Sequence, residues 1–166
     1  MNVTDKYVLF WGTIFSNFAY TPYTSPDGKE FFCAEQEFAY RKACLFNDEK
    51  TAEMILGATS PKQCKILGRK VINFDEEVWH KVRYDVMYNA CKSKFTQNEF
   101  AHKELMSYPG KTFVAADPYD EDGIWGIGLA ENNPKAFNEE TWEGQNLLGK
   151  VLTQIRDEFE KVSEIN

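Results

Sequence analysis

Apolar residues gather in three short runs near the start of the chain. The runs are YVLFWG at 7–12, IFSNFAY at 14–20 and EFFCA at 30–34, and the segment TSPDGKE at 24–30 carries the proline and glycine typical of a turn. Apolar runs of this length, bounded by turn residues, indicate strands. The first 34 residues are therefore predicted to form strands, with a turn at 24–30.

From Ala34 onward the apolar residues recur mainly at helical spacing. The exception is KTFVAA at 111–116, which predicts one more short strand. Helices are predicted at 34–46, 47–57, 60–68, 76–93, 96–107 and 146–162.

Capping residues support several of these helices. Asn47 or Asp48 is expected to cap the second helix, and Ser60, followed by a proline, begins a capping box for the third, which Gly68 is expected to end. Asp75 is expected to cap the long fourth helix. The apolar residues that recur at every fourth position of that helix predict its buried stripe: Val78, Val82, Val86 and Ala90.

Many helices, few strands and no regular β-α alternation predict a helix-rich α+β fold. The small sheet is expected to combine the N-terminal strands with the strand that precedes the DPYDEDGIWGIG loop. The chain has 166 residues, a size at which one domain can bury an adequate core, and we expect a single domain over 1–166.

Composition narrows the class of protein. The net charge of −7 and the absence of a Lys/Arg run longer than two exclude a broad surface for duplex nucleic acid. Four cysteines without a C-x-x-C pair and only two histidines suggest no zinc cluster and no disulfide framework, so reduced, mostly buried thiols are expected. The N-terminus has no signal-peptide pattern, which favours a cytoplasmic location.

Two pairs of residues carry candidate chemistry on helices. Glu35 and Lys42 are seven residues apart, nearly two helical turns, so an acid and a base project from one helix face about 10 Å apart. Trp79 and Arg83 are an i,i+4 pair, which allows a cation–π contact or a guanidinium aimed at an anion. From spacing alone, a solvated helix face is the preferred explanation of the first pair, and a core tryptophan that of the second.

The segment DPYDEDGIWGIGL at 117–129 is too rich in glycine and proline for a regular element. Its glycines lack the order of a dinucleotide fingerprint, and no P-loop lysine follows, so neither phosphate-binding device is present. The loop does hold carboxylates on a tightly turned backbone, where burial or a like charge can raise a pKa for acid–base work. A solvated acidic turn is the alternative.

Six motifs in order resemble the NADAR family of YbiA-like N-glycosidases across nearly the whole chain. They are FSNF with the PDGKEF turn, AEQEFAYRKA, SPKQCKILGRKV, VWHKVRYDVM with KFTQN, DGIWGIGL, and WEGQNLLGKVL continuing to Arg156. Gln36 departs from the pattern, because many members carry histidine at this place.

The resemblance implies hydrolysis of an N-glycosidic bond between a base and a phosphorylated ribose or an ADP-ribose unit, without metal or other cofactor. The substrate would be an early riboflavin intermediate or ADP-ribosylated guanine, the latter as a small molecule or within nucleic acid. Because charge builds at C1′ when a ribosyl C–N bond breaks, a carboxylate near that carbon and a second proton donor are needed. The resemblance implies Glu35 for the first role and Asp122 for the second, with Asp120 as the alternative; which carboxylate is acid and which is base stays open.

The same resemblance implies roles for the residues around these carboxylates. Trp79 would stack on a base or ring. The remaining residues would bind phosphate oxygens, ribose hydroxyls or other parts of the substrate, or organise the site: Asn17, Lys42, Arg69, Arg83, Trp125, Gly126 and Asn146.

Two functions from other classes use the same residues. A binding module would hold ADP-ribose or an NAD derivative without cutting it, and a regulatory interaction protein would keep only the remains of the pocket. The joint presence of Glu35, Asp122 and Trp79 argues against the second, because an inactive pocket needs none of them.

Overall fold

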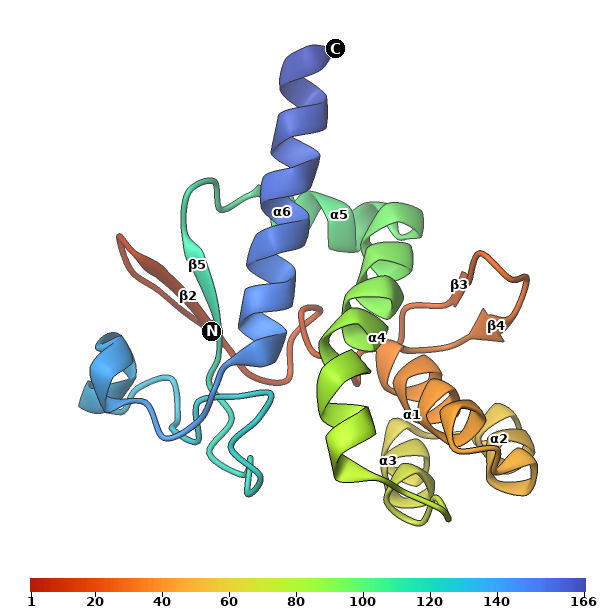
Figure 1. Ribbon diagram of the computed structural model, residues 1–166. Helices are drawn as coiled ribbons and strands as arrows, with labels where there is room; N and C mark the ends of the chain where they lie inside the picture. Colours follow the sequence, from red (N-terminus) through yellow and green to blue (C-terminus); the bar gives the residue numbers. More distant parts are fainter. The chain divides into compact units, whose positions relative to one another are not determined.

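The computed structural model describes residues 1–166, which form two compact units. The helical unit is Asn17–Glu99, and the sheet unit combines Met1–Ser16 with Phe100–Asn166. Figure 1 labels the elements of both units. The predicted helix-rich α+β fold is confirmed, whereas a single domain over 1–166 stays a prediction.

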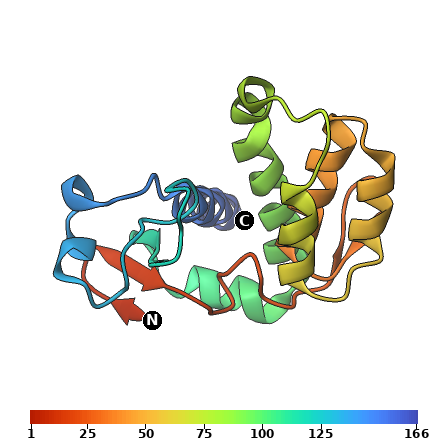
Figure 2. The ribbon, with the colours of Figure 1, turned by 90° about the horizontal axis from the view of Figure 1, so that it is seen from below.

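The helical unit begins with a hairpin and continues with helices. Strands β3 (Tyr23–Thr24) and β4 (Glu30–Phe31) pair antiparallel, and Gly28, at a φ of 85°, closes the predicted turn. Helix α1 contacts α2, α3 and α4, so it forms the centre of the helical group seen in Figure 2. The helices are α1 (Ala34–Leu45), α2 (Glu49–Leu56), α3 (Pro61–Arg69) and α4 (Glu76–Gln97).

The predicted helix caps are present. Asp48 accepts a hydrogen bond from the Thr51 N–H, Ser60 caps α3, and Asp75 caps α4. The prediction that Gly68 ends α3 is wrong, because the helix continues to Arg69. A Cβ at Gly68 would lie 3.2 Å from the Ala39 Cβ, so this glycine allows close packing of α3 on α1.

The predicted buried stripe of α4 is displaced by one residue. Val78 is exposed, and Val82 and Val86 are only partly buried, although Ala90 is buried as predicted. The stripe that the helix does bury contains two cations, Arg83 and Lys94. Its other members are Trp79, Met87, Ala90, Cys91 and Phe95. A pattern of apolar residues could not reveal this face, because charged side chains break its periodicity.

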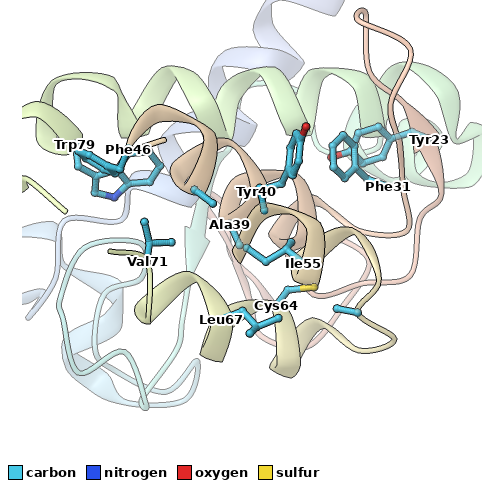
Figure 3. Close-up of a cluster of buried hydrophobic side chains, with 13 residues drawn as sticks. Tyr23, Phe31, Ala39, Tyr40, Phe46, Ile55, Cys64, Leu67, Val71 and Trp79 are labelled. Carbon is cyan, nitrogen blue, oxygen red and sulfur yellow. The ribbon is translucent and has the colours of Figure 1, made fainter. Parts of the chain in front are cut away.

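The core of the helical unit joins the hairpin to all four helices (Figure 3). Trp79 lies at one end of this cluster in the view and Tyr23 and Phe31 at the other, with Ile55 and Leu67 between α2 and α3. Burial of so many aromatic rings stabilises the unit and holds the first turn of α1 in place.

The sheet unit contains a three-stranded sheet in the order β1-β2-β5, as the sequence predicts in outline. Strand β1 (Asn2–Val3) runs antiparallel to β2 (Tyr7–Phe10), while β2 and β5 (Thr112–Ala115) are parallel, with Phe10 opposite Ala115. Parallel pairing requires a crossover, which here contains the entire helical unit.

The prediction of a strand at 14–20 is wrong. The Ser16 N–H donates to the Thr13 carbonyl, which makes a turn, and the residues after it form further bends. Phe15 is buried, edge-on to Phe10 and Phe113. The apolar residues of this run therefore lie on an irregular segment, where a single ring such as Phe15 is buried.

The other regular elements of the sheet unit are helices and 3₁₀ turns. They are α5 (Glu99–Met106), the 3₁₀ turns η1 (Pro134–Phe137) and η2 (Glu139–Thr141), and α6 (Leu147–Ile165), which packs on β5. Helix α5 starts three residues later than predicted, because Thr96 and Gln97 belong to α4. None of the helices has the length and apolar character that crossing a membrane requires.

The cysteines are reduced and mostly buried, as expected. Cys33, Cys64 and Cys91 are buried, whereas Cys44 is exposed, and all four are free thiols.

Candidate active site

Glu35 lies in the first turn of α1, and its side chain is buried. Its backbone N–H donates to the Asn17 carbonyl at 3.0 Å, and the Asn17 side-chain amide donates to Glu35 Oε2 at 2.5 Å. One asparagine therefore binds both the backbone and the carboxylate of Glu35. The segment before the hairpin is tied in this way to the start of the helix.

Burial raises the pKa of Glu35 to about 7. Four groups act in the opposite direction: the Lys65 charge, the Asn17 hydrogen bond, and the charges of Arg69 and Lys42. A carboxyl group with this pKa exchanges its proton readily at neutral pH, which is the property required of a general acid or base.

Aromatic rings support two of these cations. Lys65 Nζ lies 5.7 Å from the centre of the Phe18 ring, and Phe18 directly follows Asn17. Lys42 Nζ lies 4.5 Å from the Phe74 ring and 5.8 Å from the Trp79 ring. Cation–π attraction therefore favours positions of the ammonium groups close to Glu35.

Trp79 and Arg83 are both buried on α4. The indole packs on Phe38, with ring centres 5.1 Å apart, and belongs to the core of the helical unit. Arg83 lies 3.6 Å from the Glu76 carboxylate, which is exposed. The structure thus gives Trp79 a packing role and a contact with Lys42; stacking on a substrate stays a prediction.

Lys94 is a buried cation to which the sequence assigned no role. Burial lowers its pKa to about 8, although Cys91 and Cys33 act to raise it. Burial also raises the pKa of the Cys33 thiol to about 11, and both Glu35 and Lys94 influence that thiol. Lys94 therefore belongs to the charged surroundings of the α1 N-terminus. Its place in the KFTQN motif was the one signal available from the sequence.

Gln36, at the position where many family members have histidine, is buried next to Glu35. Its Oε1 accepts from the Phe32 N–H at 2.8 Å, and its Nε2 donates to the Ile55 carbonyl at 3.1 Å. The side chain connects the hairpin, α1 and α2, so its function in this chain is internal support.

The loop at 117–129 is bonded to the segment that leads into α6. Backbone hydrogen bonds join Gly123, Ile124, Trp125, Gly126 and Ile127 to residues 143–148. A Cβ at Gly126 would lie 2.9 Å from the Ala115 carbonyl oxygen, and one at Gly144 would collide with the Gly126 carbonyl. These two motif glycines therefore allow close backbone packing, which holds the loop rigidly.

The two candidate aspartates of this loop differ in their surroundings. Asp120 Oδ2 accepts from the Gly126 N–H at 2.7 Å, so this carboxylate closes the loop on itself. Asp122 is exposed, two residues further on, and Trp125 is partly buried. Within the loop, the internal role belongs to Asp120, and the choice between the two for catalysis stays a prediction.

Asn146 joins β5 to the start of α6. It is buried in a left-handed conformation with a φ of 55°; its Oδ1 accepts from the Ala115 N–H at 2.8 Å and its Nδ2 donates to the Phe113 carbonyl at 3.0 Å. The structure therefore supports the organising role that the sequence analysis allowed for Asn146, and substrate binding by this residue stays a prediction.

The helical unit thus gathers several of the predicted site residues around one buried carboxylate. Glu35 is surrounded by Asn17, Lys42 and Arg69, with Lys65 added by the structure, and Trp79 touches Lys42. The loop residues Asp120, Asp122, Trp125 and Gly126, with Asn146, form a second group in the sheet unit.

Comparison with known proteins places the chain in a family. Residues 8–160 match the model of the NADAR domain. The chain is 43% identical over 132 residues to Protein irg-1 of Caenorhabditis elegans, covering 78% of this chain and 61% of that protein. It is 38% identical over 169 residues to N-glycosidase R617 of Acanthamoeba polyphaga mimivirus, covering 93% of this chain and 97% of that one.

A solved structure agrees with these matches. The NMR structure of the Escherichia coli protein YbiA superimposes with a TM-score of 0.77 at 26% identity, covering 99% of this chain and 90% of that one. Fold, sequence and the order of the motifs therefore lead to one conclusion: the chain belongs to the NADAR family.

Proposed function

We propose that this chain is an N-glycosidase, a hydrolase that cleaves the bond between a base and a phosphorylated ribose or an ADP-ribose unit. The observation that carries the proposal is Glu35: a buried carboxyl with a pKa of about 7, held by Asn17 and surrounded by cations. The name of the mimivirus relative supports the type of bond.

The reaction consumes one water molecule and breaks the C1′–N bond. Positive charge builds at C1′ in the transition state, water supplies the new C1′–O bond, and the base leaves with a proton. Glu35 is the group that moves a proton, because both of its protonation states are populated near neutral pH. Asp122 is kept as the second carboxylate, with Asp120 as the alternative.

The cations near Glu35 suit a phosphorylated sugar. Lys65 and Arg69 are exposed one turn apart on α3, and Lys42 reaches the same carboxylate from α1. Ammonium and guanidinium groups bind phosphate oxygens through charge-assisted hydrogen bonds. A substrate phosphate in this group would be held close to the acid that acts on the ribose.

The test is product release from both substrate branches. Purified protein is incubated with a phosphoribosylaminouracil and, separately, with ADP-ribosylated guanosine, without added metal, and free base is measured by chromatography. We expect release from one of them and a loss of about 100-fold or more in Glu35→Gln. Full turnover by Glu35→Gln would refute the mechanism.

Calorimetry with ADP-ribose separates the enzyme from a binding module. Tight binding of ligand that stays intact, with no base released from either substrate, would favour the module. The names of relatives, which include N-glycosidases and a riboflavin biosynthesis protein, support a small-molecule substrate. A substrate within nucleic acid, a cytoplasmic location and a single domain over 1–166 stay predictions.

A further inference from the structure

Two exposed aromatic rings meet on the sheet unit. Trp11 is 54% exposed and Tyr119 is 73% exposed, yet their ring centres are only 5.8 Å apart, at an angle of 50°. Other rings of this unit, such as Phe10, Phe15 and Phe113, pack edge-on in the interior. A pair of large rings that touch each other and remain open to water can accept a third flat group.

The backbone of the sheet brings this aromatic pair together. Strands β2 and β5 are parallel and end side by side, with Phe10 opposite Ala115, and Trp11 follows the first strand directly. The Ala116 N–H donates to the Phe10 carbonyl at 2.8 Å, which extends the pairing beyond the strands. The pair therefore lies just beyond the ends of these two parallel strands.

Local turns hold both rings in position. Gly12, at a φ of 67°, turns the chain immediately after Trp11. The Tyr119 N–H donates to Asp117 Oδ1 at 2.8 Å, which fixes the turn that carries the tyrosine. Tyr119 belongs to the same loop as the candidate aspartates, and neither ring was among the predicted site residues.

The charges around Tyr119 restrict what the pair can bind. Asp117 and Glu121 each lie two residues from it along the loop. Negative charge on both sides of the tyrosine repels phosphate groups and carboxylates. A flat ring without negative charge is the ligand that fits, because every nucleobase has a π-face that stacks on aromatic side chains.

We propose that Trp11 and Tyr119 form a stacking site for a nucleobase ring on the sheet unit, from which phosphate is excluded. The proposal rests on the proposed function, because a nucleobase is the flat group that such a substrate contains. It predicts that this unit recognises a base by shape and stacking.

The test observes Trp11 directly and needs no turnover. The full chain is labelled with 5-fluorotryptophan, the Trp11 ¹⁹F resonance is assigned with Trp11→Phe, and guanosine, uridine and ribose 5-phosphate are titrated separately. We expect guanosine or uridine to shift the Trp11 resonance, ribose 5-phosphate to leave it unchanged, and Tyr119→Ala to weaken the nucleoside affinity about tenfold. Phe100→Ala, which removes another exposed ring of the same unit, is the control and should bind as the parent does.

The outcomes separate this proposal from the proposed function. A Trp11 resonance that no nucleoside moves, or that ribose 5-phosphate moves equally, would overturn the stacking site even if base is released. A resonance that responds only to protein concentration would assign the pair to self-association and would also overturn it. Nucleoside binding that persists in Glu35→Gln, with no turnover in the parent, would support the site and reject the glycosidase.

Discussion

Asn17 binds Glu35 twice: its side-chain amide donates to the carboxylate at 2.5 Å, and its carbonyl accepts from the backbone N–H at 3.0 Å. The two residues are 18 positions apart in sequence: Asn17 precedes the β3–β4 hairpin and Glu35 follows it. The carboxylate therefore cannot turn away from its surroundings without breaking its hydrogen bond to the Asn17 amide. This relationship leads to the first prediction.

Asn17→Ala should raise the pKa of Glu35 above its present value of about 7, because a hydrogen bond to the charged form stabilises that form. The limb of the pH–rate profile that belongs to Glu35 should move to higher pH. Carboxyl ¹³C NMR, with the Glu35 signal assigned by Glu35→Gln, measures the same pKa without turnover. Asn89→Ala, which removes an exposed amide on α4, is the control; an equal shift there would refute the specific role of Asn17.

Lys65→Met should also move the Glu35 limb to higher pH and should raise KM for a phosphorylated substrate. Lys65 is the strongest of the charges that lower the pKa of Glu35, and Phe18 supports it. Lys62→Met on the same helix is the matched control, since Lys62 is exposed and is not one of the main charges that lower the pKa of Glu35. If both variants gave the same profile, general surface charge would explain the effect.

Glu35→Gln should be more stable than the parent above pH 7, although it is inactive. Folding raises the pKa of Glu35 from 4.5 to about 7, so the folded state retains a proton that the unfolded chain has lost. The free energy of unfolding therefore falls as the pH rises from 4.5 to 7, by up to ~3 kcal/mol, and glutamine avoids this loss. Urea denaturation at pH 5 and pH 8 measures the difference; a gap between the variants that does not widen with pH would contradict the burial of the charge.

Substitutions of the two loop carboxylates, Asp120 and Asp122, should have different effects on stability and on turnover. Asp120→Ala should lower the free energy of unfolding by about 1 to 3 kcal/mol, because it leaves the Gly126 N–H without its partner. Asp122→Ala should leave stability within about 0.5 kcal/mol, since the side chain is exposed. Loss of turnover in Asp122→Asn, with a stable fold, would identify Asp122 as the second carboxylate; full turnover there and loss in Asp120→Asn would identify Asp120.

Local signals in the sequence were sufficient for most elements. Asp48, Ser60 and Asp75 cap helices as predicted, because a cap depends on a few neighbouring residues. The buried face of α4 could not be predicted in the same way. It contains Arg83 and Lys94, and only packing in three dimensions places charges on a buried stripe.

In the candidate site, too, local sequence predicted some features, whereas others depend on packing in three dimensions. The spacing of Glu35 and Lys42 indicated a shared helix face, but on spacing alone a solvated surface was the preferred explanation. Glu35 is buried where α1 packs against other helices, and the groups that act on it from Asn17 and α3 are distant in sequence, so its pKa could not be derived from spacing. The motifs singled out Gly126 and Asn146 as site residues. In the structure, Gly126 allows close backbone packing and Asn146 supports the backbone of β5.

The parallel pairing of β2 with β5 has a consequence for folding during synthesis. About a hundred residues separate Tyr7 from Thr112, so the first strand leaves the ribosome long before its partner exists. The helices between them form mostly local contacts and can assemble first, since loop closure over such a distance is slow. Substitutions in β2 or β5 should therefore delay the last step of folding, while those in α1 to α3 should affect the earliest one.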